Sequence, residues 1–311
     1  MKTAVILMAM GGPRNLGEVR GFLFRMFSDR AIINLSCVLR LPLAALLAQL
    51  RYKTAQKIYQ SIGGGSPLCA NTTTQAEALQ QELGDDFRCF VGFSYTAPFI
   101  AQAVAQAKAF APDQIILLPM YPQFSTTTTA SVLQEAQRQI RKQKSIAPIK
   151  AIESFPTLVG FIEATAENLL GEYAKAKNHG NPKILFSAHA IPLSRAQAGD
   201  PYPVQCLQTA QAIAGKTRLE KPDWTLCYQS AVGPIKWTTP RLEDEITVAA
   251  RAGRPIVVVP ISFVCENSET LYDLNIKNRK LAEQNGCPHY VVSQTAQTHP
   301  VFIKALGLLS L

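Results

Sequence analysis

Short apolar runs rich in β-branched residues recur along the chain and alternate with longer stretches of helical periodicity. The runs are Ala4–Met10, Cys89–Phe93, Gln114–Pro119, Ile149–Phe155, Ile184–Ala188, Thr225–Tyr228, Pro255–Phe263 and Tyr290–Val292. Runs that are apolar on both faces are typical of parallel strands covered by helices on both sides of a sheet. The pattern therefore predicts an α/β fold built on parallel sheets.

The eight runs separate into two groups of four around the polar segment 172–182. A chain of 311 residues, 47% of them hydrophobic, is long and apolar enough for two buried cores. We predict two similar doubly wound domains, residues 1–160 and 161–311. Sheets of this kind bind ligands beyond the carboxyl ends of their strands, so functional residues are expected there.

Polar residues follow several of the predicted strands. The run at 184–188 is followed by His189, and the run at 225–228 by Gln229 and Ser230. Of the four histidines in the sequence, only His189 lies at the carboxyl end of a predicted buried strand. A hydrogen-bonded structural histidine is the alternative interpretation of that position.

A group of acidic residues follows the predicted strand at 255–263. Glu266, Glu269 and Asp273 are spaced i, i+3 and i+7, so in an α-helix their carboxylates would share one face. One imidazole with a few carboxylates makes a poor permanent zinc site, but it suits a ferrous ion bound briefly and passed on. The same groups can accept protons. A solvated acidic helix face is the alternative.

Two polar loops, at 63–67 (GGGSP) and 125–129 (STTTT), could present backbone N–H groups and hydroxyls to an anion. Their spacing matches neither the dinucleotide fingerprint nor the Walker motif. The sequence therefore gives no support to a nucleotide-binding function.

The net charge of +9 favours acidic partners such as anionic lipid or a polycarboxylate molecule. The basic residues are scattered, without a basic run interleaved with aromatics, which argues against nucleic acid as a partner. The seven cysteines include no Cys-x-x-Cys pair, so neither a zinc knuckle nor a disulfide framework is predicted. Reduced thiols in a cytoplasm fit this pattern best.

The sequence offers one candidate for membrane contact. The start, MKTAVILMAMGG, is interpreted as a first buried strand rather than a signal peptide, and no run approaches the ~20 apolar residues of a membrane span. The segment 35–50 (LSCVLRLPLAALLAQL) is unusually apolar and is followed by Arg51, Tyr52 and Lys53. It is either a core helix or an exposed lip that touches a bilayer surface.

Taken together, eight segments resemble the ferrochelatase family in the family's order along nearly the whole chain. They are MAMGGP at 8–13, FLFRMFSDRAII at 22–33, IGGGSPL at 62–68, LPMYPQFSTTTTAS at 118–131, FSAHAIP at 186–192, GDPYP at 199–203, YQSAVGP with Trp237 at 228–237, and PISFVCENSETLYDL at 260–274. The resemblance implies two Rossmann-like domains, each a four-stranded parallel sheet flanked by helices, with a porphyrin in the cleft between them. It also implies a lyase that inserts Fe²⁺ into protoporphyrin IX to give protohaem and two protons, the last step of haem biosynthesis.

The resemblance assigns roles to individual residues. His189 and Glu269 look like the family's catalytic pair, and with Asp273 they would contact the metal. Arg51 and Ser66 match residues that bind the propionates. The remaining porphyrin-contacting positions match Met10, Tyr95, Tyr121, Pro122, Gln123 and Ser125.

The sequence also departs from the family's pattern. The departures are Ser94 and Thr96 on either side of Tyr95, Ala231, Asn267, Asn275 and Lys277. No cysteine-bearing extension is present, so no iron–sulfur cluster is expected, nor any other prosthetic group; iron is a substrate.

Several alternatives stay open at this point. They are a coproporphyrin III ferrochelatase, a chelatase acting on a cobalt or sirohaem precursor, and a porphyrin or haem carrier without catalysis. MAMGGP favours the protoporphyrin type. We expect a cytoplasmic protein with peripheral contact at the inner face of an anionic membrane, and the oligomeric state is left open.

Overall fold

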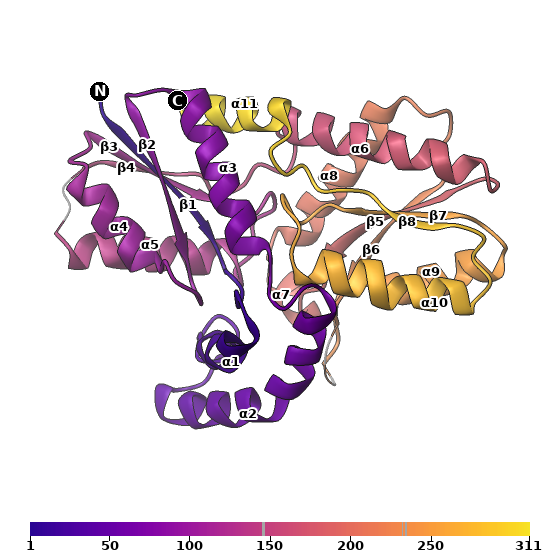
Figure 1. The fold of residues 1–311 in the computed structure, drawn as a ribbon, viewed down its shortest axis with the longest axis horizontal. Coiled ribbons are helices and arrows are strands. Elements are labelled where there is room, and N and C mark those ends of the chain that lie inside the picture. Colours follow the sequence, from indigo (N-terminus) through magenta and orange to yellow (C-terminus); the bar gives the residue numbers. More distant parts are fainter. Residues whose placement is uncertain (145–146, 232, 234) are drawn as a thin grey trace. The chain divides into compact units, whose positions relative to one another are not determined.

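The computed structural model describes residues 1–144, 147–231, 233 and 235–311, and the chain divides into two compact units (Figure 1). The first unit comprises Met1–Tyr121, Ser125–Ser154 and Gly307–Leu311, and the second comprises Pro122–Phe124 and Phe155–Leu306. The main division therefore falls slightly before the predicted boundary at residue 160. Helix α6 (Val159–Lys177) accounts for the difference, because it packs on α8 and on the sheet of the second unit.

The first unit contains a parallel sheet with the strand order β2-β1-β3-β4 among its described residues. Every residue of β1 is buried, as expected for a central strand covered on both faces. The strands are β1 (Thr3–Ala9), β2 (Phe87–Phe93), β3 (Gln114–Pro119) and β4 (Ile149–Ala151), and the helices are α1 (Val19–Phe27), α2 (Cys37–Ser61), α3 (Leu68–Leu83), α4 (Ile100–Ala109) and α5 (Thr129–Lys142), with a short 3₁₀ turn η1 (Leu16–Glu18).

The second unit repeats this topology with the order β6-β5-β7-β8, again all parallel. The strands are β5 (Lys183–His189), β6 (Trp224–Gln229), β7 (Ile256–Pro260) and β8 (Tyr290–Val292), and the helices are α6, α7 (Leu193–Gln197), α8 (Tyr202–Thr217), α9 (Leu242–Arg251), the π-helix η2 (Glu269–Asn278) and α10 (Arg279–Gln284). Helix α11 (Pro300–Leu309) begins in this unit, and its residues from Gly307 onward belong to the first unit. The predicted fold class, two similar four-stranded parallel α/β units, is confirmed.

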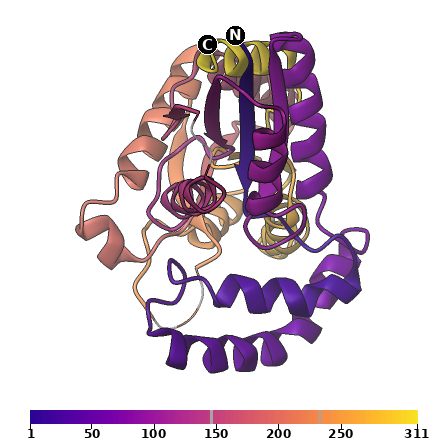
Figure 2. The same ribbon diagram turned by 90° about the vertical axis from the view of Figure 1, so that its left-hand side faces the viewer.

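Helices α1 and α2 lie beyond the carboxyl end of β1 rather than against a face of the sheet (Figure 2). Where α2 packs on α1 it turns small residues inward, including Ala44 and Ala48. Leu47 packs beside them, but other large apolar side chains of α2 are exposed, among them Val38 at 82% and Leu50 at 67%. The segment at 35–50 is therefore an exposed apolar surface and not a core helix.

No helix within the described ranges combines the length and the apolar character needed to cross a membrane.

Candidate active site

The second unit brings polar side chains together at the carboxyl ends of two neighbouring strands. His189 is the last residue of β5 and Gln229 is the last residue of β6, and the two are paired in the parallel register. Ser230 follows immediately with a positive φ of 63°, a left-handed conformation that is unfavourable for a serine. Glu269 opens the π-helix η2 after β7. Short π-helical segments occur frequently at functional sites.

His189 and Glu269 are in direct contact, with 2.8 Å between Nδ1 and Oε2. The same carboxylate oxygen accepts hydrogen bonds from Gln229 Nε2 at 3.1 Å and from Ser230 Oγ at 3.2 Å. Among the described residues, Glu269 Oε1 and His189 Nε2 have no hydrogen-bond partner. The two side chains are 25% and 41% exposed, so the pair presents one open oxygen and one open nitrogen.

Asp273 joins this pair through Ser230. The Ser230 hydroxyl lies 2.9 Å from Asp273 Oδ2 as well as 3.2 Å from Glu269 Oε2. A serine hydroxyl has a single hydrogen and can donate it to one of the two carboxylates at a time. His189, Glu269 and Asp273 therefore belong to one hydrogen-bonded group.

The prediction that Glu266 shares a helix face with Glu269 and Asp273 is wrong. Asn267 caps the start of the helix, because its Oδ1 accepts a hydrogen bond from the backbone N–H of Glu269 at 2.8 Å. The residues before Asn267 therefore belong to the loop. Glu266 is left outside the helix, where its Oε1 accepts from the N–H and hydroxyl of Thr295 at 3.0 and 2.9 Å.

The charges in the group bias where protons reside. Burial alone would lower the pKa of His189, but the charge and hydrogen bond of Glu269 outweigh it and raise that pKa. Burial would raise the pKa of Glu269, but His189, Gln229 and Ser230 outweigh it and lower that pKa. Burial and the Glu269 charge raise the pKa of Asp273, and the Ser230 hydrogen bond opposes them only in part.

Within the described ranges, no three or more His, Cys, Asp and Glu side chains are grouped as a metal-holding set. His189, Glu269 and Asp273 therefore do not form a three-ligand cluster in this structure. The paired His189 and Glu269 still present one open nitrogen and one open oxygen.

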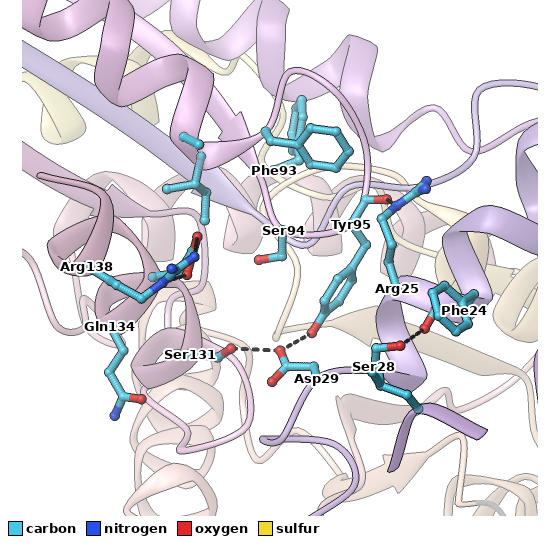
Figure 3. A pocket seen from close by; sticks show the side chains of 15 residues that line it. Phe24, Arg25, Ser28, Asp29, Phe93, Ser94, Tyr95, Ser131, Gln134 and Arg138 are labelled. Carbon is cyan, nitrogen blue, oxygen red and sulfur yellow. Dashed lines mark hydrogen bonds and ion pairs between the residues drawn. The ribbon is translucent and has the colours of Figure 1, made fainter. Parts of the chain in front are cut away.

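Tyr95, a predicted porphyrin contact, is largely buried in the first unit. Its ring meets Phe22 edge-on at 6.1 Å, and its hydroxyl donates to Asp29 Oδ2 at 2.6 Å. Figure 3 shows Tyr95 and Ser131 pointing at Asp29 from opposite sides, in a pocket of about 690 Å³ that Ser94 also lines. The Tyr95 hydroxyl is therefore already bonded within its own unit.

The other predicted porphyrin contacts lie at various depths. In the first unit, Ser66 donates its N–H to the Pro13 carbonyl oxygen at 2.7 Å, and a β-carbon at Gly12 would lie only 2.6 Å from Ser66 Cβ. In the second unit, Gln123 is buried and donates to Thr209 Oγ1 at 3.0 Å. The remaining positions are Met10 and Tyr121, both partly buried, Pro122 and Ser125, both buried, and Arg51, exposed on α2.

Several departures from the family's pattern have partners of their own. Thr96 donates to the Gly12 carbonyl oxygen at 3.0 Å, and Asn275 donates to that of Thr270 at 2.9 Å. Lys277 pairs with Glu243 at 3.1 Å rather than with Asp273. In the motif at 228–237, positions 232 and 234 lie outside the described residues.

Sequence reasoning did not assign a role to Gln229 or Ser230. Both were visible only as polar residues after a predicted strand. Their importance comes from the register between β5 and β6, which places Gln229 beside His189.

The fold is similar to that of solved chelatases. The sirohydrochlorin chelatase SirB from Bacillus subtilis subspecies spizizenii, solved with cobalt, superposes with a TM-score of 0.55 over 98% of this chain and 92% of its own, at 12% identity. CbiX, the terminal enzyme of sirohaem biosynthesis in denitrifying bacteria, gives a TM-score of 0.52 over 100% and 99% of the two chains, also at 12% identity. At these identities the likeness shows the fold alone.

The sequence itself decides the family. Residues 2–310 match the Ferrochelatase family. A ferrochelatase of Wolbachia sp. subsp. Drosophila simulans (strain wRi) is 42% identical over 99% of this chain and 98% of the relative, and one of Caulobacter vibrioides (strain NA1000 / CB15N) is 41% identical over 98% and 88%. The chain belongs to the ferrochelatase family, and it is an enzyme, a metal-chelating lyase of haem synthesis with porphyrin and ferrous iron as substrates.

Proposed function

We propose that this protein inserts Fe²⁺ into protoporphyrin IX, forming four iron–nitrogen bonds and releasing the two pyrrole protons. The observation that carries the proposal is the His189–Glu269 pair, in which Nε2 and Oε1 are open while Nδ1 and Oε2 bind each other. A base and an anionic oxygen side by side meet the two needs of the reaction, which are to remove protons and to attract a dication.

We infer that His189 is the base. In its neutral form, Nδ1–H donates to Glu269 Oε2 and leaves a lone pair on Nε2. The Glu269 charge stabilises the imidazolium that forms when Nε2 accepts a pyrrole proton, consistent with the raised pKa of His189. This is the arrangement by which a carboxylate fixes the tautomer of a catalytic histidine in other enzymes.

Glu269 Oε1 would contact the incoming iron. Its carboxylate stays ionised because the pKa is lowered, and an anionic oxygen is a suitable ligand for a ferrous ion held briefly. Asp273, whose pKa is raised, is placed behind Ser230 to receive a proton or an approaching cation. These three residues would act in sequence around one hydrogen-bonded group.

The function is tested by anaerobic assay of purified protein with Fe²⁺ and either protoporphyrin IX or coproporphyrin III. We expect turnover of protoporphyrin IX, seen as loss of free-base absorbance and appearance of protohaem. Preference for coproporphyrin III would overturn the substrate assignment. Tight porphyrin binding without turnover of either porphyrin would instead identify a carrier.

We also propose peripheral attachment to the surface of an anionic membrane, on its cytoplasmic side. The support is the exposed apolar surface of α2, which carries Val38, Leu39, Leu46 and Leu50, together with the exposed Arg51 and Lys53 and the net charge of +9. Binding to vesicles should weaken as salt rises, because screening reduces the attraction between these cations and lipid headgroups.

A further inference from the structure

Behind the His189–Glu269 pair lies a second pair of polar side chains, Ser187 and Gln229, and both are fully buried. Ser187 is two residues before His189 on β5, and Gln229 ends the adjacent strand β6. Ser187 Oγ donates to Gln229 Oε1 at 2.7 Å, and Gln229 Nε2 donates to Glu269 Oε2 at 3.1 Å. The three side chains form a chain of hydrogen bonds that runs from the interior of the sheet to the site.

The direction of this chain is fixed by its outer end. An ionised carboxylate can only accept hydrogen bonds, so Gln229 must turn its NH₂ group toward Glu269. Its carbonyl oxygen then faces Ser187, which must donate. Ser187 thus stabilises the orientation of the Gln229 amide that Glu269 requires, and that amide is one of the donors to Glu269 Oε2, beside His189 and Ser230.

We propose that Gln229, oriented by Ser187, is a positioning residue that keeps Glu269 Oε2 bonded within the protein and presents Oε1 to the reacting metal. The inference rests on the role proposed above for Glu269. The last torsion of a glutamate side chain has a broad, weakly restricted minimum, so the carboxylate plane takes its orientation from its donors. A neutral amide supplies such a donor without cancelling the charge that attracts a cation.

A purely structural role predicts a different behaviour. Buried hydrogen-bonded groups can be replaced together by apolar ones at little cost in stability, whereas removal of one partner leaves the other unsatisfied. If Ser187 and Gln229 serve only the fold, their joint replacement should spare activity. If they position Glu269, the joint replacement should keep the fold and lose activity.

The experiment compares Gln229→Met, Ser187→Ala and the double variant with Thr165→Val as the matched control. Thr165 is a buried hydroxyl of the same unit that donates within its own helix, to the Phe161 carbonyl oxygen at 2.8 Å. For each protein we would measure kcat, the KM for Fe²⁺, the Kd for protoporphyrin IX and the thermal midpoint. Glu269→Gln is measured in parallel.

We expect Gln229→Met to lower kcat by about 10- to 100-fold, the usual cost of losing a residue that orients a metal-contacting group. Porphyrin affinity should be unchanged. The double variant should resemble Gln229→Met in kcat and recover part of any stability that Ser187→Ala loses, and Thr165→Val should keep wild-type kcat.

Wild-type kcat in both Gln229→Met and the double variant, with Glu269→Gln inactive, would overturn the positioning role and leave the proposed function intact. Wild-type kcat in Glu269→Gln would overturn the proposed function itself. A fall in kcat that merely follows a fall in the thermal midpoint, in the double variant as in the single ones, would also reject positioning.

Discussion

The two units of this protein share one topology but end their central strands differently. In the first unit, β1 and β2 finish with the register pair Ala9 and Phe93, and Ser94 follows. In the second, β5 and β6 finish at the equivalent place with His189 and Gln229, and Ser230 follows. The two sheets thus offer the same position, and in the second unit that position carries an imidazole and an amide where the first unit has Ala9 and Phe93.

The largest expected effect comes from removing the imidazole that has no counterpart in the first unit. His189→Ala should lower kcat for iron insertion by about 10²- to 10⁴-fold, the range for a general base. The thermal midpoint should change little, because the side chain is 41% exposed. His179→Ala, an exposed histidine of the same unit, is the control, and near-normal turnover in His189→Ala would refute the proposed base.

Glu269→Gln should come next, with kcat lower by about 10²- to 10³-fold and porphyrin affinity retained. The amide keeps the shape of the side chain and removes the charge that attracts iron and stabilises the imidazolium. Single-turnover kinetics with bound porphyrin would separate this loss from a binding defect. An increase in KM with kcat intact would contradict a role in the chemical step.

Asp273→Asn should act mainly on the supply of iron, raising the KM for Fe²⁺ by about 10-fold while kcat changes less. The reason is its place behind Ser230, one step away from the pair with open atoms. Steady-state assays over a range of Fe²⁺ concentrations would measure both constants. A loss confined to kcat would instead place Asp273 in the chemical step.

The exposed apolar surface of α2 gives a smaller, separable effect. Replacing both Val38 and Leu39 by Ser should weaken partition onto anionic vesicles by about 10-fold, since less apolar area is buried in the bilayer interface. Vesicle flotation measures this, and Val248→Ser is the control, because Val248 on α9 of the other unit is 69% exposed, between Leu39 and Val38. Equal flotation of all three proteins would show that α2 is not the contact.

The smallest effect is on the pH dependence of stability. The pKa of His189 is raised above 6.5. Its contribution to the free energy of unfolding is therefore fully present below pH 6.5 and is lost as the pH rises through the pKa of the folded state. The pKa of Glu269 is lowered below 4.5. Its contribution to the free energy of unfolding is therefore fully present above pH 4.5 and is lost as the pH falls through the pKa of the folded state. The difference in thermal midpoint between wild type and Glu269→Gln should therefore be greatest between pH 4.5 and 6.5. A difference that is constant from pH 4 to pH 8 would contradict the ion pair.

The fold was predictable because buried parallel strands are continuous apolar runs. Strand β1 illustrates this, since all of its seven residues are buried. Strand lengths were less predictable. The run at 149–155 gives only a three-residue strand, because its pairing with β3 ends at Ala151. Apolar residues beyond it pack without pairing, as the buried Phe155 does.

The site was predictable where a residue type is chemically distinctive. A histidine at a strand end and an acid after a later strand predicted that His189 and Glu269 lie near one sheet edge, and the family resemblance paired them. Gln229 could not be recognised, because an amide after a strand has many ordinary uses and its role depends on register. The prediction for Glu266 was wrong because the i, i+3, i+7 spacing assumed a helix that already contains residue 266. Helix η2 begins at Glu269, and Asn267 caps its start.

The return of the last five residues to the first unit has a consequence for synthesis of the protein. Lys150 Nζ donates to the carbonyl oxygen of Leu309 at 3.2 Å, and a β-carbon at Gly307 would lie 3.1 Å from Glu82 Cγ. During synthesis the first unit therefore stays unfinished until residues 307–311 have left the ribosome, by which time every residue of the second unit has been made. Of these two units, the one whose synthesis begins first is completed second.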